Sequence, residues 1–321
     1  MHEEIKGSRI LVETCGNVKK GENVLVITDS ENTSIAEFIC DMSVAFGAET
    51  VMITMTSRSN HGEDPPGTVS AALLQADIVF AVTTFSLFHS SARIKACENG
   101  ARWVNMAGYT RDMLKRGGLM VDFKKQRVLA EKLARVLSEG KVVRVTTEKG
   151  TDISFSIEGR EAIPEGGISD RPGMVNSPPD IETCIAPVEG TAQGMVVIDG
   201  SIVQPGLGPV ENDVILTVKD GLVSDVSGGK EAAVFSQMLE SAADRGVYNI
   251  GEFGIGLNPE CRLCGSMLED EGVYSTAHFG IGDNHTMGGT VEAAMHTDSI
   301  FWKPSIFVDN NKIMDSGNLL I

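Results

Sequence analysis

The sequence predicts an α/β protein: a Rossmann-like parallel α/β domain at residues 1–143 and a β-rich α+β domain at residues 144–321. Up to about residue 140, short apolar strands alternate with helices, a pattern typical of a parallel sheet. Beyond it, glycines become frequent and short alternating strands replace the helices. A length of 321 residues allows each domain its own hydrophobic core.

The first half contains four β-branched, apolar runs and four segments with helical spacing. Thr33 or Ser34 is a plausible N-cap of the first long helix, and Gly47 ends it. No glycine-rich phosphate-binding loop follows any strand, so nucleotide binding is not expected. The expected strands are 24–28, 50–55, 77–82 and 103–106, and the expected helices are 35–46, 69–74, 90–99 and 123–137.

The second half begins with a hairpin pattern, in which alternating residues flank a Lys-Gly turn between residues 142 and 160. Further strands are expected at 194–198, 214–218 and 222–226, and one helix is expected at 231–245. The pattern of this half therefore predicts a sheet-rich domain, and the candidate site residues belong to that domain.

Composition excludes several functional classes. A net charge of −17 opposes binding to nucleic acid or to anionic membranes. No apolar run approaches the length of a membrane span and no secretory signal is visible, so we expect a cytoplasmic protein. The six cysteines are dispersed; Cys261 and Cys264 could form half of a zinc site or a redox pair, but we interpret them as reduced thiols in a loop.

Three of the six histidines cluster near the C-terminal end, at His278, His285 and His296. His296 and Asp298 are two residues apart, so on a strand both side chains project from one face. His278 shares its strand face with Gly280, where the missing side chain leaves room for another group. Any one of these histidines could be an ordinary buried polar residue, but the cluster indicates a metal site.

Two glutamates have contexts that suggest further ligands. Glu252 lies in a glycine-flanked strand, and Glu182 lies in a short extended run between prolines. Each alone is more typical of a solvated surface residue.

Five motifs follow one another in the second half: G-T-D-I-S-F-S-I-E-G-R, P-D-x-E-x-x-x-A-P, E-F-G-I-G, D-E-G-x-x-x-T-A-H-x-x-I-G and G-G-T-x-E-x-x-x-H-x-D. Taken in order, these motifs resemble the M29 clan of metallo-aminopeptidases, the aminopeptidase T type. The resemblance covers most of residues 145–321 and is only architectural before that.

The resemblance implies two divalent metal ions, Zn²⁺, Mn²⁺ or Co²⁺, that activate a water to cleave N-terminal residues from peptides or small amides. It also implies a homodimer. Glu292 is a candidate general base or ligand-orienting residue. His285 stands where the family has a tyrosine ligand. The implied metal ligands are Glu182, Glu252, His278, His285, His296 and Asp298.

A second branch of the same clan, the 2,5-dihydroxypyridine dioxygenases, holds one Fe²⁺ in a triad of two histidines and one carboxylate. That branch has a histidine at the position of Glu252 and none at the position of His278. Because this chain has both Glu252 and His278, we expect a hydrolase, with the Fe(II) ring-cleaving dioxygenase as the alternative. A hydrolase of a small or cyclic amide is another alternative, and a non-catalytic binding protein would require all six candidate ligands to be idle.

Overall fold

The computed structural model describes residues 2–204 and 206–321. The chain forms two compact units, each described by itself. The first comprises the chain up to Lys125 together with Gly166–Pro179, and the second comprises Gln126–Glu165 and Asp180–Ile321. The sequence pattern suggests a single boundary at residues 143–144. In the structure the chain passes from one unit to the other three times, after residues 125, 165 and 179.

The first unit contains a five-stranded parallel sheet with the order β2-β1-β3-β4-β8. The predicted parallel α/β arrangement is confirmed, because β1 pairs in parallel with β2 on one side and with β3 on the other. The strands are β1 Asn23–Asp29, β2 Glu49–Met55, β3 Ile78–Val82, β4 Arg102–Asn105 and β8 Val175–Asn176.

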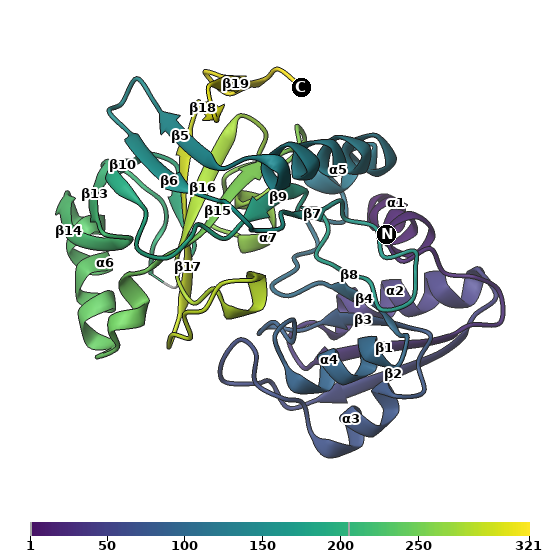
Figure 1. The fold of residues 1–321 in the computed structure, drawn as a ribbon. Coiled ribbons are helices and arrows are strands. Elements are labelled where there is room, and N and C mark those ends of the chain that lie inside the picture. The colour runs from purple at the N-terminus through teal and green to yellow at the C-terminus, as the bar shows by residue number, and fades with distance from the viewer. Residues whose placement is uncertain (1, 205) are drawn as a thin grey trace. The chain divides into compact units, whose positions relative to one another are not determined.

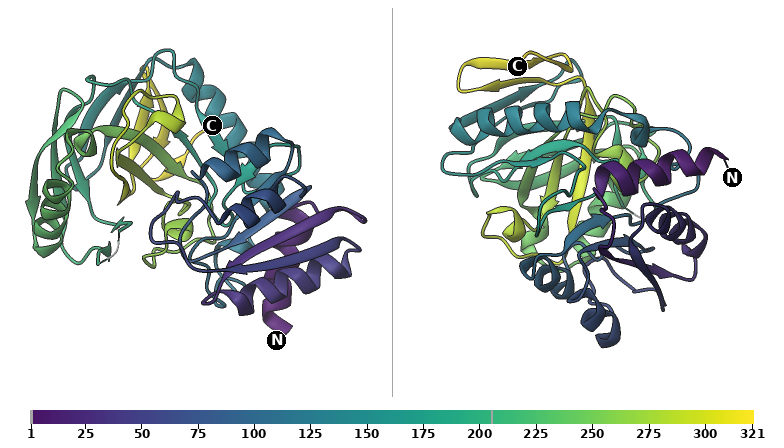
Figure 2. Two further views of the ribbon diagram at one scale, coloured as in Figure 1. Left: turned by 90° about the horizontal axis from the view of Figure 1, so that it is seen from below. Right: turned by 90° about the vertical axis from the view of Figure 1, so that its right-hand side faces the viewer.

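Helices cover both faces of this sheet (Figures 1 and 2). Residues of α3 and α4 pack in the same core cluster as Ile27 and Trp103. Asn32 is the residue before α2, and the Ser90 side chain caps α4 by accepting a hydrogen bond from the Arg93 N–H. The helical segments are α1 His2–Arg9, η1 Ile10–Cys15, α2 Thr33–Ala45, α3 Gly67–Leu73, α4 Ser91–Glu98 and η2 Gly118–Met120.

The second unit contains two sheets whose strand pairs are antiparallel. The eight-stranded sheet has the order β14-β13-β10-β6-β5-β18-β19-β20 and the seven-stranded sheet has the order β12-β11-β17-β16-β15-β9-β7. The strands of the eight-stranded sheet are β5 Val142–Thr146, β6 Asp152–Ser156, β10 Gln193–Ile198, β13 Val214–Lys219, β14 Leu222–Gly228, β18 Ser305–Val308, β19 Asn311–Asp315 and β20 Asn318–Leu319. Those of the seven-stranded sheet are β7 Ile163–Glu165, β9 Glu182–Ile185, β11 Ser201–Ile202, β12 Gly208–Pro209, β15 Ile250–Gly256, β16 Thr276–Gly282 and β17 His296–Trp302.

Aromatic rings connect the two sheets of the second unit. Phe155 of the eight-stranded sheet contacts Phe253 and Phe279 of the other sheet, and Phe279 stacks on Phe301. These rings are buried and form the core between the sheets. The helical segments of this unit are α5 Phe123–Glu139, which starts at the boundary, α6 Lys230–Ser241, η3 Arg245–Tyr248, α7 Met267–Asp270 and η4 His285–Met287. None of the helices in the described residues is both long and apolar enough to cross a membrane.

Candidate metal centre

Four neighbouring strands of the seven-stranded sheet carry a cluster of acids and histidines. β15 and β16 align Glu252 with Gly280, and β16 and β17 align Gly280 with Asp298. Directly paired residues lie on the same face of a sheet, as do residues two apart on a strand. The register therefore places these five side chains on one face: Glu182 of β9, Glu252 of β15, His278 of β16, and His296 and Asp298 of β17.

The opposite face of the same strands is largely apolar, with Thr183, Thr297 and Ser299 as its buried polar residues. Phe253 follows Glu252, Phe279 follows His278, and Phe301 projects to the same side. The alternation of the strands thus turns the aromatic rings into the core and the ligand-type residues to the other face.

The cluster consists of two groups that share Glu252. In the first, the Nε2 atom of His278 lies 3.1 Å from Oε2 of Glu182 and 3.8 Å from Oε1 of Glu252. In the second, Nε2 of His296 lies 2.9 Å from the other oxygen of Glu252, Oε2, and 3.2 Å from Oδ1 of Asp298. Within each group one potential ligand atom per residue lies within 4.8 Å of the others.

Two glycines provide the space that the imidazole rings occupy. A Cβ atom on Gly254 would lie 2.1 Å from Nε2 of His278, and one on Gly280 would lie 2.4 Å from Nε2 of His296. Both distances are far below van der Waals contact. The expectation that another group occupies the space beside Gly280 is therefore confirmed.

Charges within the cluster stabilise one another. Burial lowers the pKa of both imidazoles, but Glu182 beside His278 and Asp298 beside His296 outweigh it, so both pKa values are raised well above the usual range. Burial likewise opposes ionisation of Glu252, yet the two facing rings hold its pKa below the ordinary value. In the metal-free chain both rings therefore favour the cationic form and Glu252 the anionic form, whereas burial raises the pKa of Glu182.

Three further acids adjoin the cluster and were not singled out from the sequence. Burial and neighbouring carboxylates raise the pKa of Asp180 and of Glu271, and raise that of Glu165 to about 8. Asp180 belongs to the P-D-x-E motif and Glu271 to the D-E-G motif, so the sequence could have identified these two acids as site residues from their motifs. Glu165 pairs with Glu182 across β7 and β9, a register that the sequence does not reveal.

The residues of the cluster fit a divalent cation. Among the described residues, Oδ1 of Asp180 and Oε1 of Glu271 are buried without a hydrogen-bond partner, and Oε2 of Glu182 faces Nε2 of His278 at 3.1 Å. Six carboxyl groups in one region have only two imidazoles to balance them, so three of them favour the uncharged form and would need a further counter-charge to ionise. Carboxylate and imidazole donors suit Fe²⁺, Mn²⁺, Co²⁺ and Zn²⁺.

Two predicted site residues lie outside both groups. His285 is on η4 with a side chain 49% exposed, and its Nδ1 lies 2.8 Å from Oδ1 of Asp283. Glu292 is exposed on the same connection between β16 and β17. Neither belongs to a metal-binding group of the described residues. The same holds for Cys261, which is buried, and Cys264, which is exposed.

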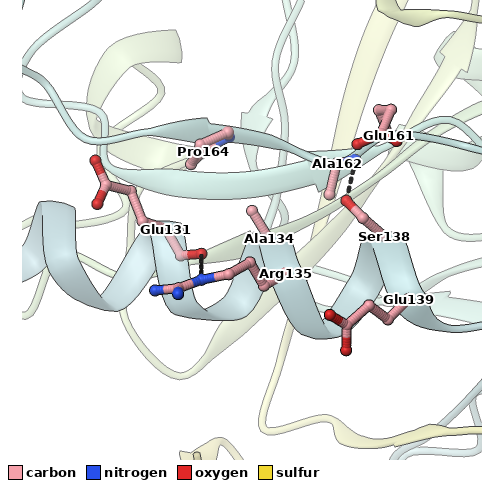
Figure 3. A pocket seen from close by; sticks show the side chains of 8 residues that line it. All are labelled: Glu131, Ala134, Arg135, Ser138, Glu139, Glu161, Ala162 and Pro164. Atoms are coloured by element: carbon pink, nitrogen blue, oxygen red, sulfur yellow. Dashed lines mark hydrogen bonds between the residues drawn. The ribbon is translucent and has the colours of Figure 1, made fainter.

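A shallow groove elsewhere in the second unit contains none of these residues. It lies between α5 and residues 161–164, and its lining includes Glu131, Ser138 and Pro164 (Figure 3). The Ala162 N–H donates to Oγ of Ser138 across it, at 2.9 Å. Neither of the two metal-binding groups found among the described residues lies in this groove.

Comparison with known proteins identifies relatives of the whole chain. A family model described as 2,5-dihydroxypyridine 5,6-dioxygenase matches residues 9–321. The 2,5-dihydroxypyridine 5,6-dioxygenase of Pseudomonas putida is 26% identical over 259 residues, which are 78% of this chain and 72% of that protein. The structure of a 2,5-dihydroxypyridine dioxygenase from the same organism matches with a TM-score of 0.84 at 20% identity, covering 98% of this chain and 96% of the other. AmpT from Thermus thermophilus matches with a TM-score of 0.71 at 14% identity, covering 100% and 99%.

These matches confirm the predicted clan and correct the predicted chemistry. The clan contains both AmpT-like and dioxygenase-like proteins, as expected. The aminopeptidase or amide hydrolase reaction, and zinc as its metal, were wrong, because the family match and the sequence relative are both dioxygenases. The error came from treating the presence of both Glu252 and His278 as diagnostic of the hydrolase branch.

Proposed function

Because the chain belongs to the 2,5-dihydroxypyridine 5,6-dioxygenase family, we propose that it is a metal-dependent dioxygenase that opens a hydroxylated pyridine ring. In the reaction that the family name describes, the C5–C6 bond breaks and both atoms of O₂ enter the open-chain product. The observation that carries this proposal is that the family match spans every residue of the two ligand groups.

We propose that Glu252, His296 and Asp298 hold a ferrous ion. Bound iron would supply the one-electron chemistry that O₂ requires and that Zn²⁺ lacks. The chain's own residues fix the donors: the Asp283 carbonyl accepts a hydrogen bond from Nδ1 of His296 at 2.7 Å, which leaves Nε2 facing the carboxylates. Two carboxylates and one imidazole make this donor set more anionic than a triad of two histidines and one carboxylate.

We also propose that a second ion occupies the group of Glu182, Glu252 and His278. The two oxygens of Glu252 divide between the groups, since Oε1 faces His278 and Oε2 faces His296. A shared carboxylate is a common way to hold two neighbouring cations. Iron content per chain, measured by elemental analysis after anaerobic loading and desalting, tests this: two ions support it and one contradicts it.

The activity is tested by loading metal-stripped protein with Fe²⁺ under argon, adding 2,5-dihydroxypyridine and admitting O₂. We expect one O₂ consumed per ring opened, measured with an oxygen electrode and by loss of the aromatic absorbance. Mass spectrometry with ¹⁸O₂ should find both labelled atoms in the product. Absence of O₂ uptake with this and with other hydroxylated pyridines would overturn the proposal.

A matched pair of variants ties the activity to the cluster. Glu252→Gln removes the shared ligand charge and should abolish O₂ uptake. Glu158→Gln changes an exposed glutamate that pairs with Lys141 on the surface, and should leave the uptake unchanged. Equal uptake by both variants would contradict the placement of the metal at Glu252.

A further inference from the structure

We infer that Glu189 is a positioning residue for the metal centre, acting through the connection between β16 and β17. This connection comprises residues 283–295 and is termed the 283–295 loop. The inference rests on the proposed metal site, because it concerns how firmly His296 is presented to an ion.

The 283–295 loop contacts His296 directly. A carbonyl oxygen can only accept, so the contact between Nδ1 of His296 and the Asp283 carbonyl, 2.7 Å, places the proton on Nδ1. That hydrogen bond sets the orientation of the ring and turns Nε2 toward Glu252 and Asp298. Displacement of the Asp283 carbonyl would therefore release the ring.

Asn284 fixes the orientation of the Asp283 carbonyl, because the Asn284 N–H belongs to the same peptide group. Its side chain is fully buried inside the loop. Oδ1 of Asn284 accepts from the Val291 N–H at 2.9 Å, and its backbone N–H donates to the Val291 carbonyl at 3.0 Å. Gly289 leaves the space for this side chain, because a Cβ there would lie 2.0 Å from Cγ of Asn284.

Glu189 anchors this arrangement to the rest of the second unit. It lies in the connection between β9 and β10. Oε1 of Glu189 accepts from Nδ2 of Asn284 at 3.1 Å and from the Thr290 N–H at 2.8 Å. Its other oxygen pairs with Arg160, which also donates to the Gly288 carbonyl.

The electrostatics of Glu189 agree with this anchoring role. Burial disfavours its charged form, but backbone N–H groups, the Asn284 amide and Arg160 together lower its pKa below the ordinary value. Glu189 and Arg160 are only 24% and 14% exposed, so solvent screens this pair less than it screens a surface ion pair. A continuous series of contacts thus runs from Arg160 through Glu189, Asn284 and Asp283 to His296.

Metal affinity tests the inference independently of catalysis. Full-length protein is stripped with a chelator and titrated with Mn²⁺, and free Mn²⁺ is followed by electron paramagnetic resonance. Glu189→Ala should weaken the affinity by about 10-fold, the lower end of the range for loss of a direct partner of a metal ligand, because Glu189 acts on His296 through Asn284 and Asp283. Glu189→Gln keeps an oxygen acceptor for Asn284 and Thr290 and should recover most of the affinity. Glu158→Ala, at an exposed site, is the control.

A second measurement reports on the His296 ring itself. In Zn²⁺-loaded wild-type protein, we expect a slowly exchanging imidazole N–H resonance, assigned by its absence from His296→Gln. Glu189→Ala should speed the exchange of this proton, and Glu189→Gln should restore it. A general loss of stability would not be corrected selectively by the glutamine variant, and thermal unfolding of all variants checks that each is folded.

The outcomes separate the inference from the proposed function. If wild-type protein binds no Mn²⁺, the metal centre itself is wrong. If wild-type protein binds Mn²⁺ and Glu189→Ala binds it equally well with unchanged N–H exchange, the role of Glu189 is overturned. Equal losses in the folded alanine and glutamine variants would also overturn it, because acceptance of hydrogen bonds would then not explain the effect.

Discussion

The imidazole ring of His296 fills the space that a side chain on Gly280 would need: a Cβ atom on Gly280 would lie 2.4 Å from Nε2 of the histidine and 2.8 Å from Cβ of Glu252. Backbone conformation does not explain this glycine, because its φ lies outside the left-handed region. Gly280→Ala should therefore displace the ring and lower the free energy of unfolding by about 1–3 kcal/mol, the usual cost of overpacking. Mn²⁺ affinity should fall at least ~10-fold.

Chemical denaturation and metal titration of the same samples check this prediction. Gly67→Ala is the control, since no atom lies within 4 Å of the added Cβ and the residue opens helix α3. A Gly280→Ala protein with wild-type metal affinity would contradict the role of this glycine in making room for His296.

Glu252 is the residue whose loss should affect metal binding most, because it faces both imidazoles with separate oxygens. At a metal concentration about 100 times its dissociation constant, binding raises the free energy of unfolding by about 2.7 kcal/mol. We expect this stabilisation in wild-type protein and its near absence in Glu252→Gln, measured by urea denaturation with and without Mn²⁺. The same stabilisation in both proteins would show that the ion binds elsewhere.

His285 should be dispensable for metal binding, in contrast to the resemblance-based assignment. Its ring pairs with Asp283 and lies outside both ligand groups. His285→Ala should keep the wild-type number of metal ions per chain, as determined by elemental analysis. Loss of one ion in this variant would mean that His285 moves to the centre when metal binds.

Only part of the candidate ligand set follows from the two-residue period of a strand, because the assignment of Glu182, Glu252 and His278 depended on the resemblance to the M29 clan. The pair His296 and Asp298 and the gap at Gly280 follow from that period alone. Register between strands is not visible, so the pairing of Glu165 with Glu182 could not be predicted. The fold of the 283–295 loop, which turns His285 away, depends on the Asn284 and Glu189 contacts, made by residues distant in sequence.

The order of strands and helices was also predictable in the first half, where periodicity is strong. The short strand β8 was not, because two residues carry no periodic signal, and it joins the first sheet from residues 166–179. Helix α5 was predicted, but its assignment to the second unit depends on contacts such as Thr183 Oγ1 to the Ala130 carbonyl, at 3.0 Å. Domain limits therefore follow from tertiary contacts that a change in composition does not reveal.

The raised pKa values of His278 and His296 determine how metal binding should depend on pH. Both rings are protonated through neutral pH in the metal-free chain, because Glu182 and Asp298 face them. A metal ion needs the unprotonated Nε2 atom, so it must displace a proton. Affinity should therefore rise as pH increases through the range where the rings are protonated, and level off above the raised pKa. The lowered pKa of Glu252 keeps that carboxylate ionised and adds no dependence in this range.

Titration with Mn²⁺ at several pH values between about 6 and 9 measures this dependence. One displaced proton changes the affinity by up to tenfold per pH unit, or about 1.36 kcal/mol. Calorimetry in buffers of different ionisation enthalpy counts the released protons directly, and Glu158→Gln should give the same slope as wild-type protein. An affinity that stays constant over this range would mean that neither ring carries a proton before metal binds. The carboxylates would then fail to raise the histidine pKa values, and the cationic state assigned to the cluster would be wrong.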